Sequence, residues 1–422
     1  MRENGGRGNR TGSAERRSAP DGAWSPMLSD YRRIFSPAGT LLFSGAGFIA
    51  RLPLSMIGVG IITMLSQLGG DYALAGSVSA TQALAGAAIG PQISRLVDRH
   101  GQRRVVLPAT AVTVAAIGAL LLCARYSAPY WTLYVAAAVA GCMPSMGALV
   151  RSRWAEVHRE SPRLLHTAYS LESVLDEVIY VVGPVLAIGL STGVSAEAGP
   201  LAAAVLLAVG VLLFAVQRRT EPPVRPQPQH AGGSALRIPG LGLLVLTVTS
   251  VGAAYGSVEV ATVAYAGAHD HKALSGLLLG VYALGSGLAG AAFGAIRPRG
   301  SITRRLLVSV CVMAVTMTPL LFAPNLAALA AMLFVAGVAL APTLITTMGM
   351  VGQLAPSGQL TESFTWIVSG LSVGVALGYA ASGWVIDVAG APAGYRVPCA
   401  AALLAAVTLL LALPRLNRAG PG

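Results

Sequence analysis

Residues 94–104 read Ser-Arg-Leu-Val-Asp-Arg-His-Gly-Gln-Arg-Arg, a short polar segment between two long apolar runs. The run before it covers about residues 72–94, and the run after it about residues 105–124. A helix needs about 20 apolar residues to cross the hydrocarbon of a bilayer, so each run is long enough to span it once. Gly101 permits a backbone conformation that other residues resist. The segment therefore predicts a tight turn that joins two membrane-spanning helices.

The rest of the chain repeats this pattern. Of its 422 residues, 54% are hydrophobic and only 11% are charged, whereas a soluble domain has about 25% charged residues. The apolar runs are continuous rather than alternating, which favours helices over a β-barrel. We therefore predict an all-α integral membrane protein with twelve spans, near 38–66, 72–94, 105–124, 129–150, 168–190, 198–217, 240–266, 273–296, 306–323, 325–348, 362–386 and 396–413.

A segment rich in proline and glycine divides the spans into two sets of six. It begins near Arg218 and includes Pro222-Pro223 and Gly232-Gly233, a composition typical of a linker. The predicted organisation is a disordered cytoplasmic tail, an N-terminal six-helix bundle, a cytoplasmic linker, a C-terminal six-helix bundle and a short cytoplasmic tail, at 1–37, 38–217, 218–239, 240–413 and 414–422. Weak similarity between the halves predicts that the bundles are related by pseudo-symmetry, as in many transporters.

Several functional classes are excluded or unsupported. The only lysine is Lys272, so the phosphate-binding loop of an ATP-driven pump cannot be present. The four cysteines form no CxxC pair and the six histidines form no clear ligand set, so we expect no metal, no cofactor and no enzymatic activity. The net charge of +12 is spread over loops rather than gathered in one patch, so nucleic acid is not an expected partner.

The segment at 94–104 also carries a family resemblance. The pattern Asp98-Arg99-x-Gly101-x-Arg103-Arg104 after the second of twelve spans resembles the signature loop of the major facilitator superfamily. The family pattern has glycine where this chain has Ser94 and a basic residue where it has Gln102. The resemblance implies that Asp98 locks the inward gate by contacting the eleventh helix near Thr361, where the helix dipole favours a carboxylate. The counterpart in the second half, Arg297-Pro298-Arg299-Gly300, contains no acid.

Gly183-Pro184 in the fifth span resembles part of a Gly-Pro element found in the drug-antiporter branches of that family. Pro184 is expected to kink the helix. The alternative is an ordinary proline that the helix tolerates.

Ionisable residues within the spans are the candidate transport site, because charge in hydrocarbon is costly. Arg51 lies about 15 Å into the first span, and we expect it to line a cavity and to pair with Asp176 or Glu177 of the fifth span. Glu172 is predicted to be shallower and to belong to a cytoplasmic arginine cluster. Glu259 in the seventh span is the weaker candidate partner, and Asp387, at a span end, is predicted to be solvated. A purely structural ion pair is the alternative for this set.

These features predict a secondary transporter that exports a small organic compound in exchange for protons by alternating access. Buried carboxylates suit proton exchange because burial disfavours their charged form. We expect a monomer in the plasma membrane whose partners are the substrate, protons and the lipid bilayer. An importer or facilitator of the same fold remains open, as does a membrane protein that does not transport, such as a sensor or a lipid scramblase.

The positions of the basic residues predict that both termini are cytoplasmic. Of the 29 Lys and Arg residues, all but Arg51, Arg125, Lys272 and Arg396 lie in the tails or in loops on the same side as the tails, and such residues concentrate on the cytoplasmic side. Reporter fusions at Gly422 and at His269 should therefore report opposite sides of the membrane. Reporters on the same side would contradict the predicted topology.

Overall fold

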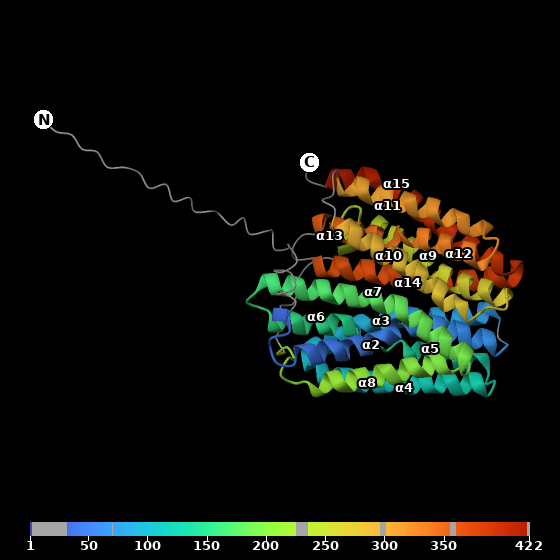
Figure 1. The fold of residues 1–422 in the computed structure, drawn as a ribbon, viewed down its shortest axis with the longest axis horizontal. Helices are drawn as coiled ribbons and strands as arrows, with labels where there is room; N and C mark the ends of the chain where they lie inside the picture. The colour runs from blue at the N-terminus through green and yellow to red at the C-terminus, as the bar shows by residue number, and fades with distance from the viewer. Residues whose placement is uncertain (2–31, 70, 225–234, 296–300, 355–359, 420–422) are drawn as a thin grey trace.

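The computed structural model describes residue 1 and residues 32–69, 71–224, 235–295, 301–354 and 360–419. The described residues therefore leave out most of the N-terminal tail, which we predicted to be disordered. They also leave out the middle of the linker and the segment Arg297–Gly300. Figure 1 shows two groups of helices side by side, with the first half of the chain in blue to green and the second half in yellow to red.

Long helices make up both halves. The first half contains α2 Thr40–Gln67, α3 Tyr72–His100, α4 Gln102–Arg125, α5 Tyr130–Ala140, α6 Met146–Val157, α7 Pro162–Gly193 and α8 Ala198–Val216. The second half contains η1 Ala235–Arg237, α9 Leu241–Ala268, α10 Leu274–Ala295, α11 Ile302–Met317, η2 Thr318–Phe322, α12 Leu326–Gly337, α13 Leu340–Leu354, α14 Leu360–Ala389, η3 Ala391–Tyr395 and α15 Arg396–Ala419.

In the described part of the chain, 11 helical segments are long and apolar enough to cross a membrane. The shorter helix α5, followed by α6, takes the place of the remaining predicted span. This arrangement confirms the predicted all-helical fold.

Two spans that we predicted as continuous are interrupted, and they occupy corresponding places in the two halves. The fourth span breaks between α5 and α6, in the segment from Gly141 to Ser145 that contains Pro144. The tenth span breaks between α12 and α13, a few residues before Pro342. Proline has no backbone N–H to donate to the carbonyl four residues earlier, so the helical ladder cannot continue through it without a gap. Paired interruptions of this kind are typical of transporter halves.

The segment 94–104 is almost entirely helical. The helix α3 runs to His100 and α4 begins at Gln102, so Gly101 alone joins them, with φ at +91°. Glycine adopts this conformation without the steric cost that a side chain would bring. The predicted tight turn is therefore confirmed, but the flanking polar residues belong to the helices.

The bundle has an arginine-rich end and an opposite end. At the arginine-rich end α2 begins, α3 meets α4, and α8 ends. At the opposite end α2 is followed by α3, and α9 by α10. Within each half, small residues let helices pack closely. A Cβ on Gly210 of α8 would lie 2.4 Å from the backbone nitrogen of Ala50 on α2, and a Cβ on Gly374 of α14 would lie 1.9 Å from the carbonyl oxygen of Thr249 on α9.

Candidate functional site

Arg51 is buried inside the first half, with 2% of its side chain exposed. Its Nε donates to the carbonyl oxygen of Gly47 at 3.1 Å. One terminal nitrogen donates to Oδ1 of Asp176 at 2.7 Å, and the other donates to Oε2 of Glu172. Both acids come from α7, so the guanidinium fastens α2 to α7.

The two carboxylates have further donors. Oε1 of Glu172 accepts hydrogen bonds from Nε1 of Trp154 at 2.7 Å and from the hydroxyl of Ser44 at 2.9 Å. Oδ2 of Asp176 accepts from Arg151 on α6 at 2.5 Å. We call this set the Arg51 cluster: Ser44, Arg51, Arg151, Trp154, Glu172 and Asp176. The cluster thus combines two guanidinium groups with two carboxylates, and charge-assisted hydrogen bonds join them.

The expected pairing was right for Asp176, but the structure corrects it for Glu172. Glu172 is fully buried against Arg51, whereas we expected it close to the cytoplasmic end of its span. The difference arises because α7 begins at Pro162 rather than near residue 168, so Glu172 lies further into the helix. Glu177 points elsewhere. A Cβ on Gly287 of α10 would lie 3.2 Å from its Oε2, so the Glu177 side chain reaches toward the second half. Among the described residues, no ion pair involves Glu177 or Glu259.

Glu259 lies on α9 in an environment of tyrosines rather than cations. Its side chain is 5% exposed, and its Oε2 accepts a hydrogen bond from the hydroxyl of Tyr379 on α14. Three further tyrosines interact electrostatically with its carboxyl group: Tyr255 on α9, Tyr282 on α10 and Tyr180 on α7. We call the four tyrosines, without Glu259, the tyrosine cluster. Since Tyr180 belongs to the first half, the cluster spans the boundary between the halves, and no sequence pattern predicted it.

The two halves meet closely at the opposite end. Asp387, at the end of α14, accepts hydrogen bonds from the backbone N–H groups of Tyr72 and Ala73 at 3.0 and 2.6 Å, where α3 begins. Asp387 is exposed, as a solvated residue would be, but the prediction missed its contact with the start of α3. Two glycines allow the approach: a Cβ on Gly383 would lie 2.3 Å from the carbonyl oxygen of Tyr72, and a Cβ on Gly76 would lie 2.3 Å from that of Tyr379.

Lys272 adds a second link at this end. Its Nζ donates to the hydroxyl of Ser66 at 2.7 Å and lies 5.7 Å from the centroid of the Tyr72 ring. Burial lowers the pKa of Lys272 to about 8, so the amine still carries its proton at neutral pH. The single lysine of the chain thus joins the loop after α9 to the first half.

The predicted gating loop lies at the arginine-rich end. Asp98 and Arg99 are on the last turn of α3, and Arg103 and Arg104 on the first turn of α4. Glu221 accepts a hydrogen bond from the backbone N–H of Arg103 at 3.0 Å. The side chain of Thr361 lies outside what the structure describes, so the expected contact of Asp98 with α14 remains a prediction.

Gln102, where the family pattern has a basic residue, anchors this turn to α6. Its amide nitrogen donates to Ser152 at 2.8 Å, and its amide oxygen accepts from the fully buried Arg153 at 2.8 Å. Arg153 also donates to the carbonyl oxygen of Gln217 at 2.9 Å and stacks on Phe214, 3.6 Å from the ring centroid. Sequence reasoning missed these roles of Glu221 and Arg153, because their partners are distant in the chain.

Gly183 and Pro184 lie within α7, which continues to Gly193. A Cβ on Gly183 would lie 1.8 Å from the hydroxyl oxygen of Ser55, which donates to the carbonyl oxygen of Ile179 at 2.8 Å. Gly183 therefore permits the close approach of α2 and α7, a role that we did not predict.

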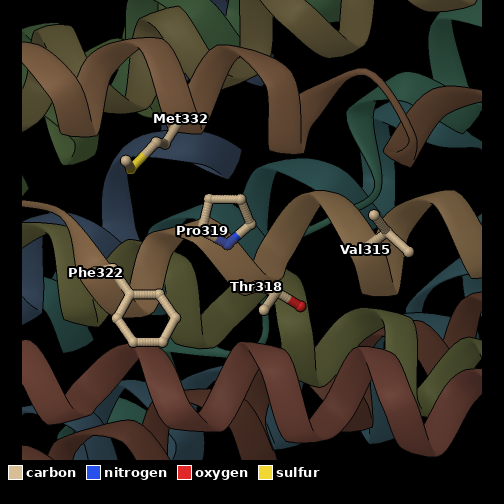
Figure 2. Close-up of a pocket in the computed structure, with 5 residues that line it drawn as sticks. All are labelled: Val315, Thr318, Pro319, Phe322 and Met332. Carbon is tan, nitrogen blue, oxygen red and sulfur yellow. The ribbon is translucent and has the colours of Figure 1, made fainter.

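Figure 2 shows a separate pocket in the second half, lined by Val315, Thr318, Pro319, Phe322 and Met332. The hydroxyl group of Thr318 donates a hydrogen bond to the carbonyl oxygen of Ala314 at 3.0 Å and is therefore already used. This apolar pocket offers no charge for binding a polar compound, so we place the candidate site at the Arg51 cluster and the tyrosine cluster instead.

Two helical halves, with a buried ion-paired cluster inside one and a buried carboxyl group near the boundary between them, define a transporter-like membrane protein, and comparison with known proteins agrees. The profile of the Major Facilitator Superfamily matches residues 43–326 and residues 244–422. The chain belongs to the major facilitator superfamily and is therefore a multi-pass membrane transporter. Comparison with curated proteins finds no match.

Solved structures share the fold at low sequence identity. The chain is similar to a peptide transporter POT in complex with sulfate (TM-score 0.72, 12% identity, 92% of this chain and 96% of that chain). It is also similar to a bacterial homologue of the human lysosomal transporter Spinster in an inward-facing, occupied conformation (TM-score 0.68, 14% identity, 91% of this chain and 98% of that chain). A third similar structure is the nucleoside transporter NupG with a D323A substitution (TM-score 0.66, 16% identity, 89% of this chain and 99% of that chain).

We predict that Arg51 and Glu172 stabilise the fold as a pair. Arg51→Ala or Glu172→Gln should each lower the free energy of unfolding by about 3–5 kcal/mol, because each leaves a buried charge without its partner. The double variant should lose less than the sum of the two single losses. Thermal unfolding of the purified protein in detergent measures this coupling.

The exposed pair of Arg125 and Glu197 is the control. The Arg125 side chain is 67% exposed, so Arg125→Ala should cost less than about 1 kcal/mol. Additive losses at Arg51 and Glu172 would contradict the proposed pairing.

We also predict that Gly383→Ala opens the opposite end, since its Cβ would collide with the backbone of Tyr72. Asp387→Asn should act in the same direction, because a neutral amide oxygen replaces the carboxylate that accepts two N–H groups. With the four native cysteines replaced, spin labels at Tyr126 and Phe322 should report a longer distance component. Gly189→Ala is the matched control, since a Cβ there meets nothing within 4 Å. Unchanged distances in both variants would contradict closure by these contacts.

Proposed function

We propose that this transporter exports a small organic compound in exchange for protons, by alternating access between its two halves. The observation that best supports proton exchange is Glu259, a buried carboxyl group that has a tyrosine hydroxyl as its partner and no cation among the described residues. Burying a charge costs free energy unless the charge is paired, and a carboxyl group avoids that cost by taking up a proton. Glu259 is therefore the proposed proton carrier.

The Arg51 cluster has a different proposed part. Glu172 and Asp176 are ion-paired, so protonating them would leave buried guanidinium groups without partners. Asp176 is the more accessible of the two, with 29% of its side chain exposed, and Arg51 and Arg151 share it. We assign the cluster to the lining of the transport path, where it fixes α2 and α6 against α7. Glu177, which reaches toward α10, is the second candidate for proton transfer.

The proposed orientation places the arginine-rich end in the cytoplasm, in accordance with the distribution of basic residues. Closure of the opposite end through Asp387 and Lys272 then corresponds to an inward-facing state. In the outward-facing state, Asp98 would hold the arginine-rich end closed against the start of α14. The plasma membrane is the proposed location.

Export is supported by the resemblance of Gly183-Pro184 to the drug-antiporter element. An importer or facilitator of the same fold remains the second candidate, since the similar solved structures include a nucleoside transporter and a peptide transporter. A sensor or scramblase has weaker support, because neither needs a buried carboxyl group at the boundary between the halves.

Transport into everted vesicles tests the proposal, with a panel of compounds and with or without a protonophore. We expect protonophore-sensitive accumulation of at least one compound. Glu259→Gln should abolish this accumulation, because an amide cannot exchange a proton.

Glu197→Gln is the matched control, since Glu197 pairs with Arg125 away from both clusters, and it should leave accumulation unchanged. Gradient-driven accumulation that survives Glu259→Gln would overturn the assignment of the proton carrier. Uptake that is insensitive to the protonophore for every compound would overturn antiport itself.

A further inference from the structure

The tyrosine cluster contains a buried polar atom with no partner. Tyr282 is 2% exposed, and its hydroxyl group has no hydrogen-bond partner among the described residues. A buried hydroxyl without a partner costs free energy. Such a group in a native structure calls for an explanation, and a ligand that uses the hydroxyl is one.

The surroundings of this hydroxyl are aromatic and include an acidic side chain. The Tyr255 and Tyr282 rings lie with their centroids 6.2 Å apart and are tilted by 31°. Tyr379 holds Glu259, and a Cβ on Gly58 of α2 would lie only 2.7 Å from the Tyr379 hydroxyl oxygen, so the first half comes close to this group. Tyrosine rings attract a cation placed within about 6 Å of their centroids, and the attraction grows when the site is desolvated.

We infer that Glu259 and the tyrosine cluster bind the ammonium group of the transported compound, which makes the substrate an organic amine in its protonated form. This inference rests on the proposed transport function. The Glu259 carboxylate neutralises the ammonium charge, the rings of Tyr255 and Tyr282 surround it, and the hydroxyl of Tyr282 accepts one of its N–H groups.

Access to this site is from the boundary between the halves. Tyr180 on α7 is 37% exposed, and Tyr255 is only partly buried, whereas Tyr282 and Tyr379 are buried. The exposed members therefore form the entrance and the buried members form the base. A site shared by both halves is where a rocking transporter can present its substrate to either side.

The same carboxylate serves the proton and the ammonium ion, so the two compete. The titratable groups that face Glu259 are Tyr255 on its own helix, Tyr379 on α14, Tyr282 on α10 and Tyr180 on α7. Phenols are neutral at physiological pH, so the carboxyl group of Glu259 is the member of this set that exchanges a proton. Amine binding should therefore weaken as the pH falls and should release a proton where Glu259 was protonated.

Calorimetric titration of the purified full chain in detergent tests the inference without requiring transport. The probes are arylalkylammonium ions of one to three rings, each compared with its N,N,N-trimethyl derivative and its neutral alcohol. We expect the ammonium ions to bind and the alcohols to bind at least about tenfold more weakly. Glu259→Gln should lower the affinity for ammonium ions by about tenfold or more, since a charged hydrogen bond and an ion pair are lost.

Tyr282→Phe separates a ligand contact from a structural role. It should lower the affinity for the primary ammonium ions by about tenfold and leave the affinity for the trimethyl derivatives unchanged, because these have no N–H group to donate. Tyr134→Phe is the matched control, since the Tyr134 hydroxyl bonds to Ser77 in the first half, and it should bind both series as the unaltered chain does.

Three results would overturn the inference: no ammonium ion binds at millimolar concentration, the alcohols bind equally well, or Tyr282→Phe weakens both ammonium series alike. Protonophore-sensitive transport of a neutral or anionic compound, together with any of these results, would leave the proposed antiport standing and remove only the substrate class.

Discussion

A charge within the apolar core of this bundle must find its partner in the protein, because hydrocarbon supplies none. Arg51 shows how far this constraint reaches. Its guanidinium requires two carboxylates from α7, and these in turn recruit Trp154, Ser44 and Arg151. The packing of α2, α6 and α7 follows from these contacts. Glu259 meets the same constraint differently, with a hydroxyl rather than a cation as its partner. Arg51 is thereby held by ion pairs, whereas Glu259 is held by a neutral hydroxyl group.

The interrupted spans show why the two halves differ in chemistry although they share a plan. The breaks at Pro144 and Pro342 stand at corresponding places. In the first half, the helix after the break is α6, which supplies Arg151 and Trp154 to the Arg51 cluster. In the second half, the titratable groups around Glu259 come from α9, α10 and α14 instead. The halves therefore place an ion-paired network on one side of the boundary and an unpaired acid on the other.

The sequence predicted what depends on local pattern. Continuous apolar runs predicted the spans, Gly101 predicted the turn, and the position of Arg51 along its run predicted burial and an acidic partner on the fifth span. It wrongly favoured Glu177 over Glu172, because the right choice depends on where α7 begins and on which of its faces meets α2. The tyrosine cluster was missed, since its members lie on four helices and tyrosine in an apolar run carries no distinctive signal. The contact of Asp387 was missed because its partners are backbone N–H groups from a distant helix.

The contact of Asp387 also gives the predicted role of Asp98 a physical context. Asp387 lies near the end of α14 and caps the N–H groups at the start of α3, where the positive end of the helix dipole favours a carboxylate. Asp98 lies near the end of α3, and the resemblance to the family directs it toward the start of α14. The two helices would thus exchange roles between the two ends of the molecule, each capped by an acid from the other. If each cap breaks when its end opens and the other forms as the opposite end closes, the free energy lost at one end would be offset at the other, which is what alternating access requires.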